Sequence, residues 1–245
     1  MLAKLSRRAV ASFLVGLVAA SLADASSAQA DPLRHITFSY SVNHFVSTEV
    51  RSSGIGTASS GVSTQSASGQ DRGTIVVDVI AATQDGGLVV DVSQQQVEPV
   101  RQLPVVRIAV LGNGDLTFDP EKQISNEEIV VARYLARGFV PAGELTVGTG
   151  WKQSQHGANM SRDLAYRVTA LPSSEVLQFT VDGEEKVTGA GAYTQTLHGT
   201  GSYNVKRLVP EDLVVKSYLR VDRASATTAD SQVHITLVSD SMKPK

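Results

Sequence analysis

Apolar and polar residues alternate along most of this chain after residue 31, and this alternation restricts its fold more than any other feature. In the first such segment the apolar residues Ile36, Phe38, Tyr40 and Val42 are separated by single threonine and serine residues. Successive side chains of a strand point to opposite faces, so this pattern is typical of a half-buried β-strand. Its recurrence predicts a mainly β domain built from antiparallel strands.

Glycine-containing turns separate the predicted strands. Residues 74–82 and 88–93 should form one hairpin around Asp85-Gly86, and residues 105–110 and 116–118 another around Asn113-Gly114. Gly and Asn tolerate the positive φ that tight hairpin turns require. For the same reason, Asp182-Gly183 and Gly199-Thr200-Gly201 predict two further turns. The remaining strands are expected at residues 36–42, 151–155, 164–170, 176–181, 185–198, 202–207, 213–222 and 232–239.

A capping box marks the one predicted helix. The Ser125 hydroxyl can accept a hydrogen bond from the Glu128 amide, and the Glu128 carboxylate can accept one from the Ser125 amide. An apolar stripe follows, and Gly138 suits a helix end, so a helix is predicted from Asn126 to Arg137. The predicted fold class is mainly β (β-rich α+β), an antiparallel curved sheet or half-barrel with this helix covering one face.

The stretch from Ser52 to Gln70 has a different composition. It carries no charge and is rich in serine, glycine, threonine and alanine. Such a segment buries little apolar surface. The sequence leaves two interpretations open, a flexible loop or two weak edge strands joined at Ser59-Ser60-Gly61.

The N-terminus has the parts of a secretory signal peptide. Lys4, Arg7 and Arg8 precede an apolar stretch of about a dozen residues, short of the roughly 20 that a spanning helix needs. Ala28-Gln29-Ala30 then offers small residues for cleavage after Ala30. We therefore expect a periplasmic or secreted protein, exported by the general secretory or the twin-arginine route. Residues 31–245 are expected to form a single β-rich domain, with two halves meeting near residues 139–150.

Composition narrows the classes of partner. The formal charge is −2, and it becomes −4 once Lys4, Arg7, Arg8 and Asp24 leave with the signal peptide. The chain has no basic stripe of the kind that nucleic-acid-binding proteins carry, so nucleic acid is not an expected partner. No integral membrane segment is expected after signal removal. The sequence has no cysteine, so the core must hold the domain together without disulfides.

No residue pattern marks a catalytic, cofactor or metal site. The five histidines, His35, His44, His156, His198 and His234, lack the spacing of a local metal motif and are expected on strand faces. Phosphate-binding loops, dinucleotide fingerprints and G-x-S-x-G motifs do not occur. A hydrolase with residues drawn from separate loops stays open. Its signature would be a cleft where a histidine contacts both a carboxylate and a hydroxyl or a metal.

Trp151 is the single tryptophan and opens a predicted strand. A lone tryptophan at such a position is usually a core anchor whose indole N–H finds a partner. The other interpretation is that Trp151 lines a ligand site. In that case Arg162 and Asp163, near His156 and Asn159 in the sequence, could form a polar rim beside it.

Several short motifs resemble a known pattern. Phe139-Val140-Pro141, Leu145, Val147-Gly148 and Trp151 resemble a pattern in uncharacterised bacterial secreted β-rich proteins, a domain family of unknown function. Those proteins also place a D-G turn before an apolar strand, like Asp85-Gly86-Gly87-Leu88 here. Some of them look like LolA-like periplasmic lipoprotein carriers, whose open curved sheet has a helix plugging its concave face. The resemblance implies this fold type and carries no catalytic residues.

Three hypotheses describe the function. The preferred one is non-enzymatic binding of a lipid, another apolar small molecule or an envelope partner, because a curved sheet with one covering helix can leave an apolar cavity. The second is a structural or assembly role through a long unprotected sheet edge near Ser52–Gln70, which would give oligomers. The third is a hydrolase with an unrecognised site. The sequence fixes neither the ligand nor the oligomeric state.

Overall fold

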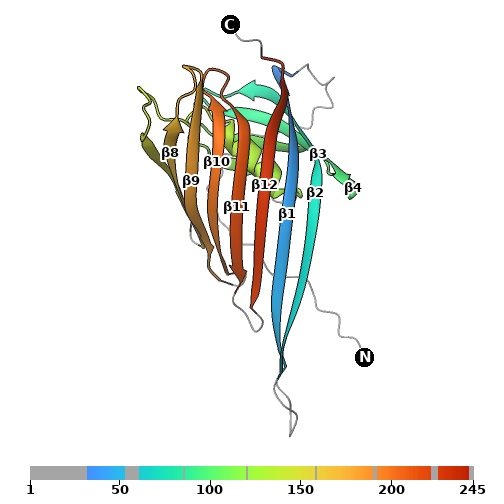
Figure 1. Cartoon of the computed structure of the whole chain (residues 1–245). Helices are drawn as coiled ribbons and strands as arrows, with labels where there is room; N and C mark the ends of the chain where they lie inside the picture. The colour runs from blue at the N-terminus through green and yellow to red at the C-terminus, as the bar shows by residue number, and fades with distance from the viewer. Residues whose placement is uncertain are drawn as a thin grey trace. The chain divides into compact units, whose positions relative to one another are not determined.

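The described part of the chain is one antiparallel sheet with one helix (Figure 1). The computed structural model describes residues 32–52, 61–84, 86–119, 121–157, 159–189, 192–221 and 226–242. The chain divides into two units, Met1–Ala30 and Asp31–Lys245, and all described residues belong to the second. The elements are β1 (Arg34–Ser52), β2 (Gly61–Ala82), β3 (Leu88–Glu98), β4 (Val100–Gln102), β5 (Val106–Val110), β6 (Leu116–Phe118), α1 (Asn126–Tyr134), β7 (Gly150–His156), β8 (Met160–Ala170), β9 (Val176–Val187), β10 (Tyr193–Asn204), β11 (Val209–Val221) and β12 (Thr227–Asp240).

The first and last strands pair in the interior of the sheet. From β1 the chain runs outward to β6, and after α1 it begins again at the opposite end with β7 and returns inward to β12. The strand order is β6-β5-β3-β2-β1-β12-β11-β10-β9-β8-β7, with β4 paired to β3. The sheet is open, since β6 and β7 are the ends of this order. The prediction of a mainly β, antiparallel, open sheet with one helix is therefore confirmed. Residues 135–149 link α1 to β7, and the strands before and after this connection belong to the same sheet.

The core lies between α1 and one face of the sheet, here called the inner face. On β1 the inner face carries Ile36, Phe38, Tyr40 and Val42, as the alternation predicts, and all four are buried. The antiparallel register places apolar residues of the neighbouring strands opposite Phe38, namely Ile75 on β2 and Leu237 on β12, whereas Ile36 faces Asp240 at the end of β12. The helix contributes Val131, Ala132 and Tyr134 to the same cluster.

Two predicted turns are wrong. β9 runs straight through Asp182-Gly183, and β10 runs straight through Gly199-Thr200-Gly201. Glycine at positions 183 and 201 leaves space for side chains of the neighbouring strands. A Cβ on Gly183 would lie 2.5 Å from Leu164 Cδ2, and one on Gly201 would lie 2.7 Å from both Leu213 Cδ2 and Phe179 Cζ. Glycine in a strand therefore lets large neighbours lie over the backbone of a strongly bent sheet.

The hairpins predicted around Asp85-Gly86 and Asn113-Gly114 are confirmed as β2–β3 and β5–β6, with Asp85 itself outside the described residues. Gly86 and Gly114 have φ of 82° and 90°, the left-handed conformation expected of them. In the stretch from Ser52 to Gln70, residues 61–70 belong to β2 and Ser52 ends β1. The turn between them lies outside the described residues. The edge-strand interpretation therefore holds for the described part.

The capping box of α1 is confirmed. The Glu128 amide donates to Ser125 Oγ at 3.1 Å, and the Ser125 amide donates to Glu128 Oε2 at 2.8 Å. The helix ends at Tyr134, three residues before the predicted end at Arg137. Gly138 does not close it in a left-handed conformation. Its amide donates instead to the Gly112 carbonyl at 3.0 Å, and a Cβ there would lie 2.2 Å from that oxygen. Glycine at 138 thus joins the chain after α1 to the β5–β6 turn.

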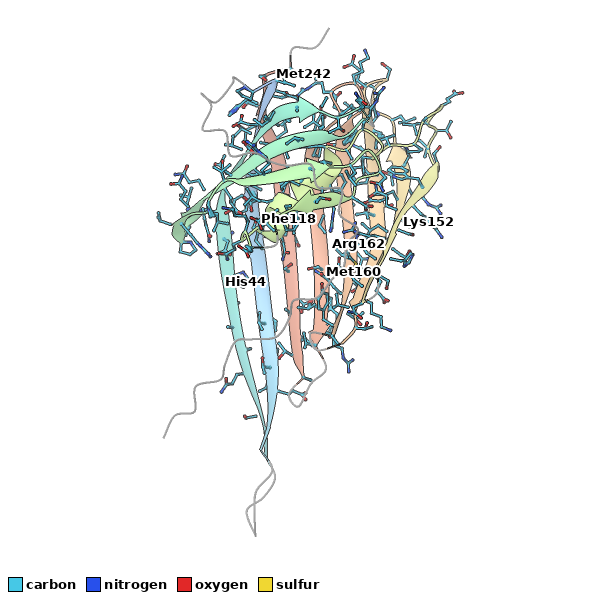
Figure 2. The ribbon with its side chains drawn as sticks, turned by 180° about the vertical axis from the view of Figure 1, so that it is seen from behind. His44, Phe118, Lys152, Met160, Arg162 and Met242 are labelled. Carbon is cyan, nitrogen blue, oxygen red and sulfur yellow. The ribbon has the colours of Figure 1, made fainter. Side chains whose placement is uncertain are left out.

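The helix covers only part of the inner face, as Figure 2 shows for the side on which it lies. Among the described residues, no element lies over the ends of the long strands farthest from α1. We call this uncovered region the open half. No helix among the described residues is long and apolar enough to cross a membrane.

Candidate functional site

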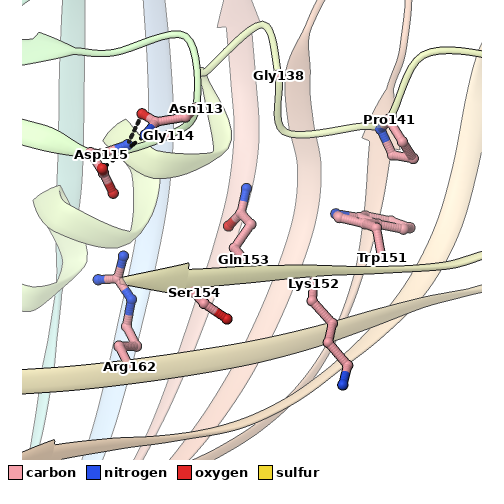
Figure 3. Close-up of a pocket in the computed structure, with 10 residues that line it drawn as sticks. All are labelled: Asn113, Gly114, Asp115, Gly138, Pro141, Trp151, Lys152, Gln153, Ser154 and Arg162. Atoms are coloured by element: carbon pink, nitrogen blue, oxygen red, sulfur yellow. Dashed lines mark hydrogen bonds between the residues drawn. The ribbon is translucent and has the colours of Figure 1, made fainter. Parts of the chain in front are cut away.

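A pocket of about 330 Å³ lies where the two ends of the sheet approach each other (Figure 3). One wall is the β5–β6 turn with Asn113 and Asp115, and another is the chain after α1 with Gly138 and Pro141. β7 forms the floor. The sheet curves far enough that Gly114 lies next to Gln153, with 3.3 Å between its Cβ position and Gln153 Nε2. A volume of this size is at the lower end for small-molecule sites.

Gln153 presents an amide donor to this pocket. The Tyr166 hydroxyl donates to Gln153 Oε1 at 3.2 Å, which identifies the other terminal atom as the NH₂ group. Burial raises the pKa of Tyr166 to about 12, so its hydroxyl stays protonated and keeps donating at neutral pH. Gln153 Nε2 is buried and has no hydrogen-bond partner. A ligand acceptor at this position would satisfy it.

Arg162 places a guanidinium beside the same pocket. It is only 5 % exposed, and its Nε has no hydrogen-bond partner. Glu185 lies directly opposite on β9, but its Oε1 accepts from the Tyr193 hydroxyl at 2.5 Å. Within the part of the chain that the structure describes, no ion pair joins Arg162 to an acidic side chain. Figure 3 shows its guanidinium directed toward the turn that carries Asp115.

Position 162 could have been recognised from the alternation of its strand. Arg162 is in phase with Leu164, Tyr166 and Val168, all buried on the inner face. A charged residue in the apolar phase of a strand is unusual because burial of an unpaired charge is costly. The adjacent Asp163 is exposed on the opposite face, so the suggested polar rim of Arg162 and Asp163 is half right.

Trp151 lines the pocket and also packs in the core. Its ring is stacked on Tyr166 with a centroid distance of 5.1 Å and an interplanar angle of 9°. Its Nε1 is buried and has no partner, contrary to the usual behaviour of a core tryptophan. The two interpretations of Trp151, core anchor and ligand-lining residue, thus describe different sides of one ring. Its role toward a ligand stays a prediction.

Aromatic rings fill the space between α1 and the sheet. Phe139 lies at their centre, with ring centroids 4.7 Å from Tyr134, 4.8 Å from Tyr203 and 5.5 Å from Phe179. Further contacts reach Trp151 and Tyr166. The apolar cavity expected beneath the helix is therefore occupied by side chains of the protein itself.

Apolar surface remains accessible in the open half. The pairing register defines two cross-strand rows there. One runs Leu164, Gly183, Leu197, Ser217, Ser231 and His44, and the next runs Arg162, Glu185, Gln195, Leu219, Ala229 and Val46. Leu197, Leu219 and Val46 are half-buried. Arg162 thus borders both the pocket and a strip of half-buried aliphatic side chains.

The histidines do not form a reactive centre. Four of them pair with an aspartate on a neighbouring strand of the outer face: His35–Asp78 at 2.7 Å, His198–Asp182 at 2.6 Å, His234–Asp212 at 2.7 Å and His156–Asp163 at 3.5 Å. His35 Nε2 also lies 3.5 Å from Thr37 Oγ1, so a histidine does contact a carboxylate and a hydroxyl. These groups are on the exposed outer face, where His198 borders an open hollow of about 480 Å³.

His44 is the exception, because it lies on the inner face with Nε2 2.5 Å from the Cβ position of Gly69. No group of three His, Cys, Asp or Glu side chains that could hold a metal occurs among the described residues. The pocket therefore offers hydrogen-bond donors and one buried cation, and the Asp115 carboxylate in its wall is already paired with the Asn113 amide. This arrangement fits an anionic acceptor better than a metal ion.

Comparison with known proteins adds little to this geometry. No family model and no curated protein matches the chain. Among solved structures, it is similar to one described as lipid–protein interactions in lipovitellin, with a TM-score of 0.45 and 8% identity. The match covers 87% of this chain and 26% of that chain. At this TM-score and identity, the likeness is too weak to carry a functional conclusion.

Proposed function

We propose that the protein is exported by its N-terminal signal peptide and acts as a binding protein, without catalysis, for an amphipathic ligand. The ligand's anionic group lies against Arg162 and Gln153 in the pocket between the sheet ends. Its apolar part lies on the open half of the inner face. This extends the preferred hypothesis of apolar-ligand binding and moves the site away from the filled space beneath α1.

The observation that carries this proposal is the buried, unpaired guanidinium of Arg162. Burying a charge without a partner costs several kcal/mol, so such groups normally have a counterion. No acidic side chain among the described residues forms an ion pair with the Arg162 guanidinium, although Asp115 lines the same pocket, and Gln153 Nε2 and Trp151 Nε1 add two buried donors without partners nearby. A carboxylate or phosphate oxygen would accept from these groups and supply the missing negative charge.

The apolar part of the ligand is inferred from the row that contains Arg162. Leu219 lies three strands away in that row, which at strand spacing is about 14 Å. Leu164 and Leu197 lie in the next row. A long acyl chain that starts at Arg162 can reach all of them without displacing any core residue.

The test compares palmitate with its neutral glycerol ester, monopalmitin, by titration followed through Trp151 fluorescence. Three proteins are used: the wild type, Arg162→Gln, and Arg167→Gln, which removes an exposed arginine from the outer face of the same strand. We expect palmitate binding to weaken about tenfold in Arg162→Gln and to stay unchanged in Arg167→Gln. Monopalmitin should bind all three proteins similarly.

Two outcomes would overturn the proposal. If neither palmitate nor monopalmitin binds the wild type, the proposal that an acyl chain lies on the open half is wrong. If wild type and Arg162→Gln bind palmitate with equal affinity, the proposal that Arg162 holds the anionic group is wrong. Native mass spectrometry of the mature chain purified from a periplasm, with lipid extraction, would then identify the natural ligand.

A further inference from the structure

The hairpin formed by β1 and β2 extends beyond the strands beside it, as Figure 1 shows. β1 pairs with β2 down to Ser52 and Gly61, whereas pairing of β2 with β3 begins only at Arg72. Residues 61–71 of β2 therefore have a strand partner on one side only, among the residues that the structure describes. Side chains 63–68 are all exposed. This segment, residues 61–71, is called the free edge.

The free edge lacks the features that normally prevent edge-to-edge pairing. Natural edge strands are blunted by charges, by proline or by being very short. From residue 61 to 70 the sequence is GVSTQSASGQ, with no charge and no proline. The first charged side chains, Asp71 and Arg72, come where β3 begins to cover the edge. The free edge is thus a regular strand with unpaired backbone groups and nothing to repel a further strand.

We propose that the free edge pairs with the free edge of a second copy of this chain, antiparallel and related by a two-fold axis. The register that uses all of residues 61–71 is centred on Ser66. It places Thr64 opposite Ser68 of the other copy and Gln65 opposite Ala67. The hydroxyl side chains of Thr64 and Ser68 face one another, and hydroxyl pairs of this kind stabilise cross-strand contacts. The two sheets then continue into each other through β2.

A second copy fits this edge better than a different partner for two reasons. Partner choice at strand edges depends largely on complementary charge, and an edge whose residues 61–70 are uncharged selects no charged strand. In the two-fold register, no like charges oppose each other, since Asp71 faces Gly61. Among the described residues, β1 has no pairing with β12 past Thr48, so residues 61–64 of β2 lie in a two-stranded ribbon, which is marginally stable alone, and pairing with residues 68–71 of the other copy adds a third strand there. The contact is isologous and therefore closed, which limits assembly to a dimer.

Charge placed at the two-fold axis tests the proposal. In Ser66→Lys, two lysines face each other across the axis, and in Ser66→Glu two glutamates do so. We expect sedimentation equilibrium to show a dimer for the wild type and dimerisation weakened about tenfold or more for each variant alone. An equimolar mixture of the two variants should recover the dimer, because lysine then faces glutamate. Thr200→Lys, at an exposed position of β10 that is paired with both β9 and β11, should dimerise like the wild type.

Either of two results would overturn the proposal. The first is a wild type that stays monomeric at every concentration reached. The second is a mixture of Ser66→Lys and Ser66→Glu that behaves like each variant alone. Recovery in the mixture cannot come from a folding defect, so the test remains decisive even if one variant is less stable. The outcome is independent of ligand binding at Arg162.

Discussion

The carboxylate of Asp240 has no exposed surface and joins the end of β12 to the start of β1 and to the β10–β11 turn. Arg34 donates to it from Nε at 2.9 Å and from Nη2 at 2.7 Å, and Arg207 donates at 3.0 and 2.8 Å. Asp240→Asn leaves two arginines facing each other without a counterion. We expect a loss of about 3–5 kcal/mol in the free energy of unfolding, measured by urea denaturation. Asp163→Asn is the control, because that side chain is 61% exposed and should cost about 0.5 kcal/mol or less. Equal losses would contradict this account.

The same carboxylate should make stability depend on pH. Burial alone would raise the pKa of Asp240, but hydrogen bonds from Arg34, the Met242 amide and Arg207 hold it below its ordinary value. The folded pKa is therefore lower than the unfolded value of about 3.9. The contribution is complete above that value and is lost as pH falls through the folded pKa. Urea midpoints of wild type and Asp240→Asn should accordingly converge between about pH 5 and pH 2. Parallel curves would be evidence against the assignment.

At the scale of elements, the stability of α1 depends on the capping box in its first turn. Ser125→Ala should cost about 1 kcal/mol of unfolding free energy in urea denaturation, because the Glu128 amide loses its acceptor.

The pKa of Glu128 is shifted in the opposite direction to that of Asp240, since burial raises it despite the hydrogen bonds from Ser125. Its ionisation thus destabilises the fold as pH rises above the unfolded value of about 4.3. Glu128→Gln keeps an acceptor oxygen and removes the charge. It should be at least as stable as wild type in urea at pH 7, and a large loss would disprove this.

The glycines of β10 give a prediction that opposes strand propensity. Valine favours strands over glycine, yet Gly201→Val would drive its side chain into Leu213 and Phe179. We expect destabilisation of about 1–3 kcal/mol in urea denaturation. Thr200→Val, at the exposed neighbouring position, should be neutral or stabilising. A gain of stability in Gly201→Val would show that the sheet relaxes at this point.

These elements also show how far sequence reasoning reached. The alternation in β1, the hairpin turns at Gly86 and Gly114, and the Ser125–Glu128 cap are local patterns, and each was predicted. Gly183 and Gly201 were misread because a glycine required by a turn and one required by a close side chain look alike in sequence. The candidate site could not be predicted for a different reason. Gln153 and Arg162 acquire meaning only when the two ends of the sheet approach, and that approach depends on contacts between residues far apart in the chain.

At the scale of the described unit, the inner face is divided into two parts with different roles. Under α1, rows such as Val168, Phe179, Leu213 and Ile235 are buried and filled by aromatic and aliphatic side chains. In the open half, the rows keep their apolar phase but remain half-buried. Residues of the covered part should therefore affect stability, and residues of the open half should affect binding.

Leu213 and Leu219 lie on the same face of β11 and allow this division to be tested with one chemical change. Leu213→Gln places an amide among buried side chains, and we expect a loss of about 3 kcal/mol or more. Leu219→Gln lies in the row of Arg162 and should cost about 1 kcal/mol or less while weakening both palmitate and monopalmitin. Arg162→Gln weakens palmitate alone. If Leu219→Gln leaves both affinities unchanged, the acyl chain does not lie on the open half, and the anionic pocket then acts without it.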